Sequence, residues 1–165
     1  MQKILLVCLG NICRSPVGEG ISLHLIREYH LEQRFWVDSA GTAGYHIDES
    51  PDPRTIANAH KNGVDLSALR ARQIKPEDLD YFDNIYVMDR SNYNDVVAMT
   101  KTKEQVRKVE FLLNLIEPGK NLPVPDPYYG QEKDFENVFQ LVNSACRKML
   151  SLPVAGDERQ HIKPI

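Results

Sequence analysis

The sequence predicts an α/β protein in which about four parallel strands form a doubly wound sheet with helices on both faces. Two observations support this fold class. Short apolar runs typical of buried strands alternate with longer stretches whose apolar residues recur at helical spacing. Several of these runs end in small or polar residues. Because the carboxyl ends of parallel strands meet at one edge of a sheet, we expect the functional residues to gather there.

Four segments have the composition of strands. The first covers residues 4–7, and the others cover residues 35–40, 84–88 and 109–113. Residues 4–7 could be mistaken for part of a short signal sequence, but a Gly-Asn pair and Arg14 follow without a small-residue cleavage pattern. We therefore interpret this run as the first core strand.

Helical patterns occupy the segments between and after these strands. They cover residues 16–29, 51–63 and 92–99, whereas residues 66–79 favour a loop with a short helix. From residue 132 to residue 149, apolar residues recur at spacings of three and four, which predicts a long final helix with one buried stripe. Cys146 falls in that stripe and is expected in the core.

Length and composition bound the remaining possibilities. The chain has 165 residues, of which 42% are hydrophobic and 26% charged, so we expect a single catalytic domain over residues 1–152 and a polar, frayed tail over residues 153–165. A net charge of -3 argues against nucleic-acid binding, and no apolar stretch approaches the length of a membrane span. Two of the three cysteines lie in one loop, which favours a reducing compartment, and we expect a cytoplasmic protein.

The loop between the first strand and the first helix carries the strongest chemical signal. Residues 8–16 read Cys-Leu-Gly-Asn-Ile-Cys-Arg-Ser-Pro. A helix N-terminus offers unpaired backbone N–H groups and positive dipole charge, so it binds anions. Together with Arg14, these groups favour the thiolate form of Cys8, which is the nucleophilic form. The planar guanidinium of Arg14 can also hold two oxygens of a phosphate group.

These residues carry a family resemblance. The stretch from residue 7 to residue 16, with Asp-Pro-Tyr-Tyr-Gly at residues 126–130, resembles the low molecular weight protein tyrosine phosphatase family. The resemblance covers nearly the whole chain and implies a flavodoxin-like phosphatase fold. It also implies a monomer that hydrolyses phosphotyrosine in proteins or peptides, and small aryl phosphates, through a cysteinyl-phosphate intermediate. No metal or other cofactor is expected, and the five histidines show no ligand spacing.

The resemblance assigns roles within the loop. Cys8 is the nucleophile, Arg14 binds the phosphoryl group, and Ser15 donates its hydroxyl to the thiolate when that thiolate is the leaving group. Asn11 holds the loop in a strained conformation. The other loop residues contribute backbone N–H groups or support, namely Leu9, Gly10, Ile12 and Cys13.

A second segment supplies the acid. Three prolines bracket Asp126 within residues 123–127 and restrict its backbone. The departing oxygen of a phosphomonoester needs a proton, and the water that cleaves the thiophosphate needs a base. By resemblance Asp126 fills both roles, and Tyr128 and Tyr129 form an aromatic rim.

Other positions match the family outside these two segments. Ser39 matches a serine that hydrogen-bonds the loop asparagine, Tyr45 matches an aromatic residue of the pocket wall, and the adjacent His46 is a candidate for tuning substrate choice. Asp89 matches an aspartate that supports the loop, and Arg72 matches an arginine near the second strand, although a solvated surface position is the simpler interpretation for Arg72. The chain departs from many relatives at Leu69, where they carry a histidine that bonds to the loop network.

Three alternatives remain from the sequence. An arsenate reductase of the same fold needs further redox cysteines, and only Cys146 is available. A protein-arginine phosphatase tends to carry threonine where this loop has Ile12, and an apolar residue there favours phosphotyrosine. A phosphate-binding module without turnover is expected to lack Cys8 or Asp126. Oxidation that joins Cys8 to Cys13 in a disulfide is a further hypothesis, about regulation.

Overall fold

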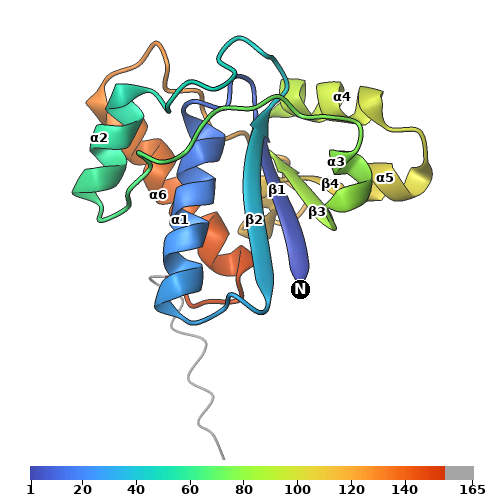
Figure 1. Cartoon of the computed structure of the whole chain (residues 1–165), viewed down its shortest axis with the longest axis horizontal. Helices are drawn as coiled ribbons and strands as arrows, with labels where there is room; N and C mark the ends of the chain where they lie inside the picture. The colour runs from blue at the N-terminus through green and yellow to red at the C-terminus, as the bar shows by residue number, and fades with distance from the viewer. Residues whose placement is uncertain (155–165) are drawn as a thin grey trace, which may run out of the picture.

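A computed structural model describes residues 1–154 and shows one four-stranded parallel sheet (Figure 1). The strand order is β2-β1-β3-β4. The four strands are β1 (Gln2–Cys8), β2 (Phe35–Gly41), β3 (Asn84–Val87) and β4 (Val109–Phe111). Because β1 pairs with β2 on one side and β3 on the other, the chain reverses its winding direction at β1, and such a switch point is where open α/β sheets bind ligands.

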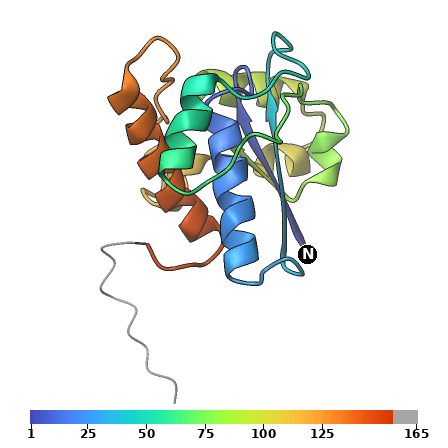
Figure 2. The same ribbon diagram turned by 60° about the vertical axis from the view of Figure 1, so that its left-hand side comes forward.

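Helices cover both faces of this sheet (Figures 1 and 2). One layer contains α1 (Arg14–Glu28), α2 (Pro53–Lys61) and α6 (Glu132–Met149). The other contains α3 (Asp78–Tyr81), α4 (Arg90–Met99) and α5 (Lys103–Arg107), and the 3-10 helix η1 (Leu112–Leu115) directly follows β4. None of the helices within residues 1–154 has the length and apolar character needed to cross a membrane.

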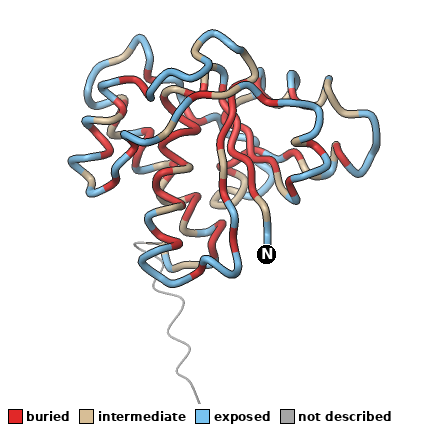
Figure 3. The backbone as a smooth tube through the Cα atoms, in the orientation of Figure 1, coloured by how far each residue is buried: buried red, intermediate tan, exposed pale blue. Residues whose placement is uncertain are grey.

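The alternation of side chains along β1 explains the two layers. Ile4 and Leu6 pack into the apolar cluster under α1 and α6, whereas Leu5 and Val7 pack into the cluster under α4. All four side chains are fully buried, and the buried segments concentrate in the sheet and along α1 (Figure 3). A strand buried on both faces requires a continuous apolar run, which is why β1 was recognisable in the sequence.

The predicted α/β class, the parallel sheet and the four strands are confirmed, with corrections at the ends of elements. The predicted strand over residues 109–113 is wrong for its last two residues, which begin η1. Helix α4 starts at Arg90 rather than residue 92 because the Asp89 side chain accepts a hydrogen bond from Asn92 N and caps the helix. The predicted tail lies outside the described residues from residue 155 onward.

Candidate active site

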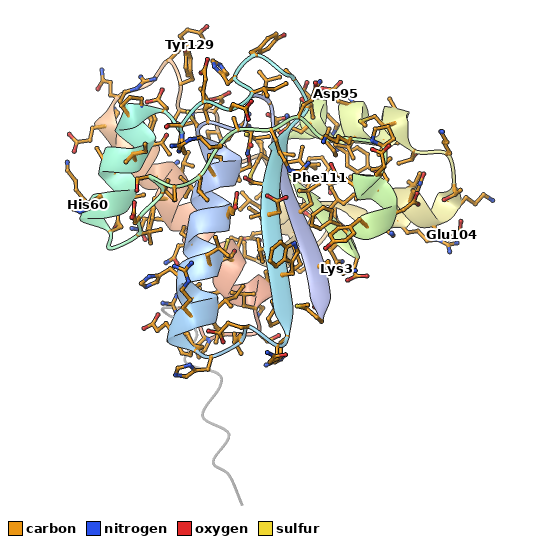
Figure 4. All side chains as sticks on the ribbon, viewed as in Figure 1. Lys3, His60, Asp95, Glu104, Phe111 and Tyr129 are labelled. Carbon is orange, nitrogen blue, oxygen red and sulfur yellow. The ribbon has the colours of Figure 1, made fainter. Side chains whose placement is uncertain are left out.

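A cavity of about 270 Å³ opens at the edge of the sheet where β1 ends. Tyr129 marks this end of the molecule in Figure 4, on the far side from Lys3 near the start of β1. The cavity is formed by the loop after β1, the loop after β2 and the loop before α6. Its lining residues are Cys8, Leu9, Gly10, Ile12, Cys13, Arg14, Tyr45, His46, Asp126, Tyr128 and Tyr129.

Cys8 is the last residue of β1 and is buried. Its Sγ lies 3.0 Å from the hydroxyl of Ser15, which sits in the first turn of α1 and is fully buried. No side chain caps α1, and its first turn contains no acidic residue. The backbone N–H groups of this helix end are therefore left for an anion, next to the cysteine sulfur.

Asn11 fixes the shape of the loop. Its backbone is in the left-handed region, at a φ of 55°, which asparagine tolerates better than most residues. The side-chain Nδ2 donates to the hydroxyls of Ser15 and Ser39, each at 2.8 Å, and Oδ1 accepts from Arg72 N at 2.9 Å. The expected hydrogen bond between Ser39 and Asn11 is therefore present, and every polar atom of this buried amide has a partner.

Arg14 lies under the cavity with almost no exposed surface. Its Nη1 donates to Asp89 Oδ2 at 2.7 Å and to the Val124 carbonyl at 3.1 Å, while Nη2 donates to Asp126 Oδ2 at 3.3 Å. Burial opposes the positive charge, but the neighbouring Cys8, Asp89 and Asp126 outweigh it and raise the pKa of Arg14. The guanidinium is a permanent, oriented cation at the cavity.

The loop before α6 presents Asp126. Val124 N donates to the Met88 carbonyl at 2.7 Å, which ties this loop to the end of β3. The Asp126 side chain is 44% exposed, and its Oδ1 accepts from Tyr128 N at 3.1 Å. Asp126 therefore lines the same cavity as Cys8 and contacts Arg14 directly, while its side chain remains partly exposed.

Aromatic side chains form the outer wall. Tyr45 lines the cavity and is 76% exposed, and Tyr128 meets Tyr129 edge to face, with ring centroids 4.9 Å apart. Arg54 at the start of α2 lies over the Tyr128 ring at 5.4 Å and is held by Asp52. The three tyrosines give this cavity an aromatic lining, which suits contact with another aromatic ring.

His46 lies at the same rim, above the loop. A Cβ placed on Gly10 would come within 3.2 Å of the imidazole, so glycine allows this close approach. His46 Nδ1 lies 2.7 Å from a Glu49 carboxylate oxygen, which orients the ring. The imidazole is thus positioned at the entrance of the cavity.

The structure corrects the simpler interpretation of Arg72 as a solvated surface residue. Arg72 is partly buried, and its guanidinium bridges Asp38 at 2.9 Å and Asp78 at 2.9 Å. Its backbone N–H supports Asn11, as described above. Leu69 packs against the apolar cluster under α1, so the position contributes packing in place of the polar contact that a histidine would give.

Sequence reasoning missed three residues that shape the site. A Cβ on Gly41 would lie 2.7 Å from the Leu9 carbonyl oxygen, so only glycine lets the end of β2 approach the loop. Glu19 accepts a hydrogen bond from the Ser39 hydroxyl, and Arg54 supports Tyr128. Glu19 could have been noticed in the sequence because it is a carboxylate among the largely buried residues of α1. The contacts of Gly41 and Arg54 depend on tertiary structure and could not.

Metal ligation finds no support in residues 1–154, where no group of three or more histidine, cysteine, aspartate or glutamate side chains could hold an ion. The ionisable groups that line the cavity include the thiol of Cys8, the guanidinium of Arg14 and the carboxyl group of Asp126.

A cysteine and an arginine in an anion-binding loop, with an aspartate facing them, define the class of cysteine-dependent phosphatases. A profile of the low molecular weight phosphotyrosine protein phosphatase family matches residues 3–160. The human low molecular weight phosphotyrosine protein phosphatase is 40% identical over 90% of this chain and 94% of its own. This chain belongs to the low molecular weight phosphotyrosine protein phosphatase family.

Solved structures agree in fold. A protein tyrosine phosphatase from Entamoeba histolytica superimposes with a TM-score of 0.85 at 33% identity, covering 92% of this chain and 96% of that chain. A Drosophila arginine phosphatase superimposes with a TM-score of 0.82 at 28% identity, covering 92% and 96%. The fold is therefore shared by phosphatases of two named specificities.

Proposed function

We propose that this protein hydrolyses phosphotyrosine in proteins or peptides through a cysteinyl-phosphate intermediate. The observation that carries the proposal is the placement of Cys8, Arg14 and Asp126 around one cavity whose outer wall is made of tyrosines. The cavity combines an anion site, formed by the Cys8 loop, with aromatic side chains at its outer wall. These two features match the phosphate group and the phenyl ring of a phosphotyrosine side chain.

In the first step, the Cys8 thiolate attacks phosphorus and forms an S–P bond while the P–O bond to the tyrosine breaks. The backbone N–H groups of residues 9–14 and the Arg14 guanidinium hold the three peripheral oxygens. Protonated Asp126 transfers its proton to the departing phenolic oxygen, so the leaving group departs as neutral tyrosine.

In the second step, a water molecule attacks phosphorus and the S–P bond breaks. Asp126, now a carboxylate, takes a proton from the water, and inorganic phosphate leaves. The Ser15 hydroxyl, 3.0 Å from Sγ, donates to the sulfur as it regains negative charge. Each role is filled by a side chain or backbone group of this chain.

Phosphoarginine is an alternative substrate to consider because the Drosophila arginine phosphatase has the same fold. Ile12 lines the cavity, and an apolar side chain at this point suits a phenyl ring better than a charged guanidinium. For arsenate reduction a further redox cysteine outside the Cys8 loop is needed, but Cys146 is fully buried in α6, where burial raises its pKa to about 12. A binding module without turnover would not require Asp126 at the cavity.

Hydrolysis of p-nitrophenyl phosphate, of a phosphotyrosine peptide and of a phosphoarginine peptide tests the proposal. We expect turnover of the first two substrates, loss of turnover in Cys8→Ser, and weak turnover in Asp126→Asn. Trapping the wild type with acid during turnover of phosphorus-labelled substrate should give label bound to Cys8. Activity that survives Cys8→Ser, or a preference for phosphoarginine, would overturn the proposal.

The proposal includes the oligomeric state and the cellular compartment of the protein. The three cysteines are free thiols, as a nucleophilic cysteine requires, and we propose that the protein works as a monomer in the reducing cytoplasm. Size-exclusion chromatography with light scattering should give the mass of one chain, and a larger particle would contradict the monomer. Fractionation of the source cells should recover the protein with cytoplasmic markers, and recovery elsewhere would contradict the compartment.

A further inference from the structure

Glu19 is a partly buried carboxyl group that the catalytic steps above do not use. It lies in α1, and its Oε2 accepts a hydrogen bond of 2.5 Å from the Ser39 hydroxyl on β2. Ser39 is itself buried, so this bond is shielded from solvent. The contact joins the helix to the strand beside the Cys8 loop.

The hydrogen bonds from Glu19 continue to the nucleophile. Ser39 Oγ accepts from Asn11 Nδ2, the same nitrogen donates to Ser15 Oγ, and Ser15 Oγ lies next to Cys8 Sγ. An amide nitrogen has two hydrogens and no acceptor site, so Asn11 must be the donor to both serines. Each serine therefore has its own hydrogen free for one further bond. Ser39 donates to Glu19, and Ser15 has two acceptors in reach, Cys8 Sγ at 3.0 Å and the Ala40 carbonyl oxygen at 3.4 Å, of which the sulfur is the nearer.

The result is a chain of donors with an anion at each end. We propose that ionised Glu19 is a positioning residue that fixes Ser39 and Asn11, and through them directs the Ser15 hydroxyl onto the Cys8 thiolate. This inference rests on the proposed role of Cys8 as nucleophile. Protonation of Glu19 replaces a charge-assisted hydrogen bond by a neutral one of roughly half its strength, so the chain loosens and Cys8 becomes less reactive.

The surroundings of Glu19 shift its pKa toward neutral pH. Burial raises the pKa of Glu19 to about 7, the Ser39 hydrogen bond opposes the rise, the charge of Asp38 on β2 adds to it, and the charge of Arg72 opposes it. Arg72 is already bridged between Asp38 and Asp78, so it does not neutralise Glu19 directly. Glu19 therefore changes charge near neutral pH.

The rate of alkylation of Cys8 by iodoacetamide tests the proposal without turnover. Measured from about pH 5.5 to about pH 8.5, the wild type should show an increase of about three- to tenfold centred near pH 7, in addition to the ionisation of Cys8 itself. Glu19→Gln keeps the shape and an acceptor for Ser39 but has no ionisation, so this inflection should vanish. The matched control is Glu28→Gln, which removes an exposed carboxylate from the same helix and should keep the wild-type profile.

Ser39→Ala provides a second, independent variant because it interrupts the chain while leaving Glu19 in place. It should abolish the inflection too, and it keeps the test valid if Glu19→Gln fails to fold, which thermal unfolding would reveal. An unchanged profile in Glu19→Gln, or an inflection that persists in Ser39→Ala, would overturn the proposal. If alkylation shows the inflection but no phosphate ester is hydrolysed, the proposed function fails while the coupling of Glu19 to Cys8 stands.

Discussion

Asp89 binds Arg14 and caps a helix with the same carboxylate. Its Oδ2 accepts from Arg14 Nη1 at 2.7 Å, and its Oδ1 accepts from Asn92 N at 2.8 Å, at the start of α4. The aspartate therefore holds the guanidinium from below, so that Nη2 is turned toward the cavity and Asp126. This arrangement couples the position of Arg14 to the helix layer on the opposite face of the sheet.

Substitution of Asp89 should separate the two roles. Asparagine has one acceptor oxygen, so Asp89→Asn can cap α4 or hold Arg14, but not both. Since asparagine is a good N-cap, we expect Asp89→Asn to lower kcat about tenfold or more with a loss of stability below about 1 kcal/mol. Asp89→Ala should lower kcat similarly and lose about 1–3 kcal/mol. Urea unfolding and steady-state kinetics measure both effects, and equal stability of the two variants would contradict the helix-capping role.

Removal of Asp126, the proposed acid, should affect substrates according to their leaving groups. In Asp126→Asn we expect kcat to fall about 10²- to 10⁴-fold with phenyl phosphate, whose phenolate needs a proton to depart. The fall should be clearly smaller with p-nitrophenyl phosphate because nitrophenolate is stable without one. Measurement of kcat for both substrates checks this, with Glu104→Gln as a control that removes an exposed carboxylate far from the cavity. An equal loss for both substrates would argue against Asp126 as the acid.

The close contact of Gly41 with the loop should make this position intolerant of a methyl group. The added Cβ would meet the backbone oxygens of Leu9 and Ala43, at 2.7 Å and 3.0 Å, and the backbone cannot turn aside as a side chain could. We expect Gly41→Ala to lose about 1–3 kcal/mol of stability and to lower kcat at least about tenfold, because the Cys8 loop is displaced.

Gly119→Ala is the matched control for that variant. Gly119 has a φ of +74° and open space around it, so alanine there loses about 1 kcal/mol through backbone strain without touching the site. Its kcat should equal that of the wild type at a temperature where both are folded. Full activity in Gly41→Ala would show that the loop accommodates the methyl group.

The fold could be predicted from the sequence because the two central strands, β1 and β3, contain short apolar runs that are buried on both faces of the sheet. Ile4 to Val7 and Ile85 to Val87 could be located from composition alone, and the residues that follow them mark the edge where the site forms. Helix α5 was missed because five residues with one Thr102 cap give no periodic pattern. Short elements of this kind are defined by tertiary packing.

The site was predictable where chemistry demands particular residues at fixed spacing, and less so where contacts depend on register. Cys8 and Arg14 belong to one loop, and their spacing in the sequence is enough to predict a phosphate-binding loop with a nucleophilic cysteine. Glu19 meets Ser39 because α1 packs beside β2, and Gly41 meets Leu9 because β1 and β2 are in register from Gln2 to Cys8. Contacts between segments far apart in the sequence arise only once the sheet has formed.

The two cysteines of the loop should differ sharply in reactivity. Burial raises the pKa of Cys13 to about 12, with the charges of Asp52 and Cys8 acting in the same direction, so Cys13 remains a thiol at neutral pH. We expect iodoacetamide at about pH 7.5 to modify Cys8 at least about tenfold faster than Cys13 in the folded protein. Peptide mass spectrometry after limited alkylation measures the ratio, and comparable rates would contradict the raised pKa of Cys13.

Oxidation tests a second consequence of their shared loop. Peroxide should convert Cys8 to a sulfenic acid, which condenses with the Cys13 thiol to form a disulfide and water. Dithiothreitol should then restore activity in the wild type, whereas Cys13→Ser should lose activity irreversibly on longer exposure. Absence of a bridge between Cys8 and Cys13 in the mass spectrum of the inactivated protein would contradict this prediction.

Glu19 should make the protein less stable as the pH rises through neutrality. Its ordinary pKa of 4.5 in the unfolded chain is raised to about 7 in the folded protein, chiefly by burial. Between these values the folded state keeps a proton that the unfolded state has released, so the free energy of unfolding falls with increasing pH over this window and the deficit is complete above about pH 7. Its full size is about 1–3 kcal/mol. Glu19→Gln has no such titration, so it should gain on the wild type across the same window.

Urea unfolding of the wild type, Glu19→Gln and Glu28→Gln at about pH 4.5, 6 and 8 measures this difference directly. The advantage of Glu19→Gln over the wild type should be smallest at the lowest pH and largest at the highest, and Glu28→Gln should show no comparable trend because Glu28 is exposed. A difference that does not change with pH would mean that Glu19 ionises with equal ease in both states. If the trend is found, ionised Glu19 lowers the stability of the protein at the pH where it is proposed to position Cys8. A loss of stability in exchange for activity is expected of a residue whose role is in the active site.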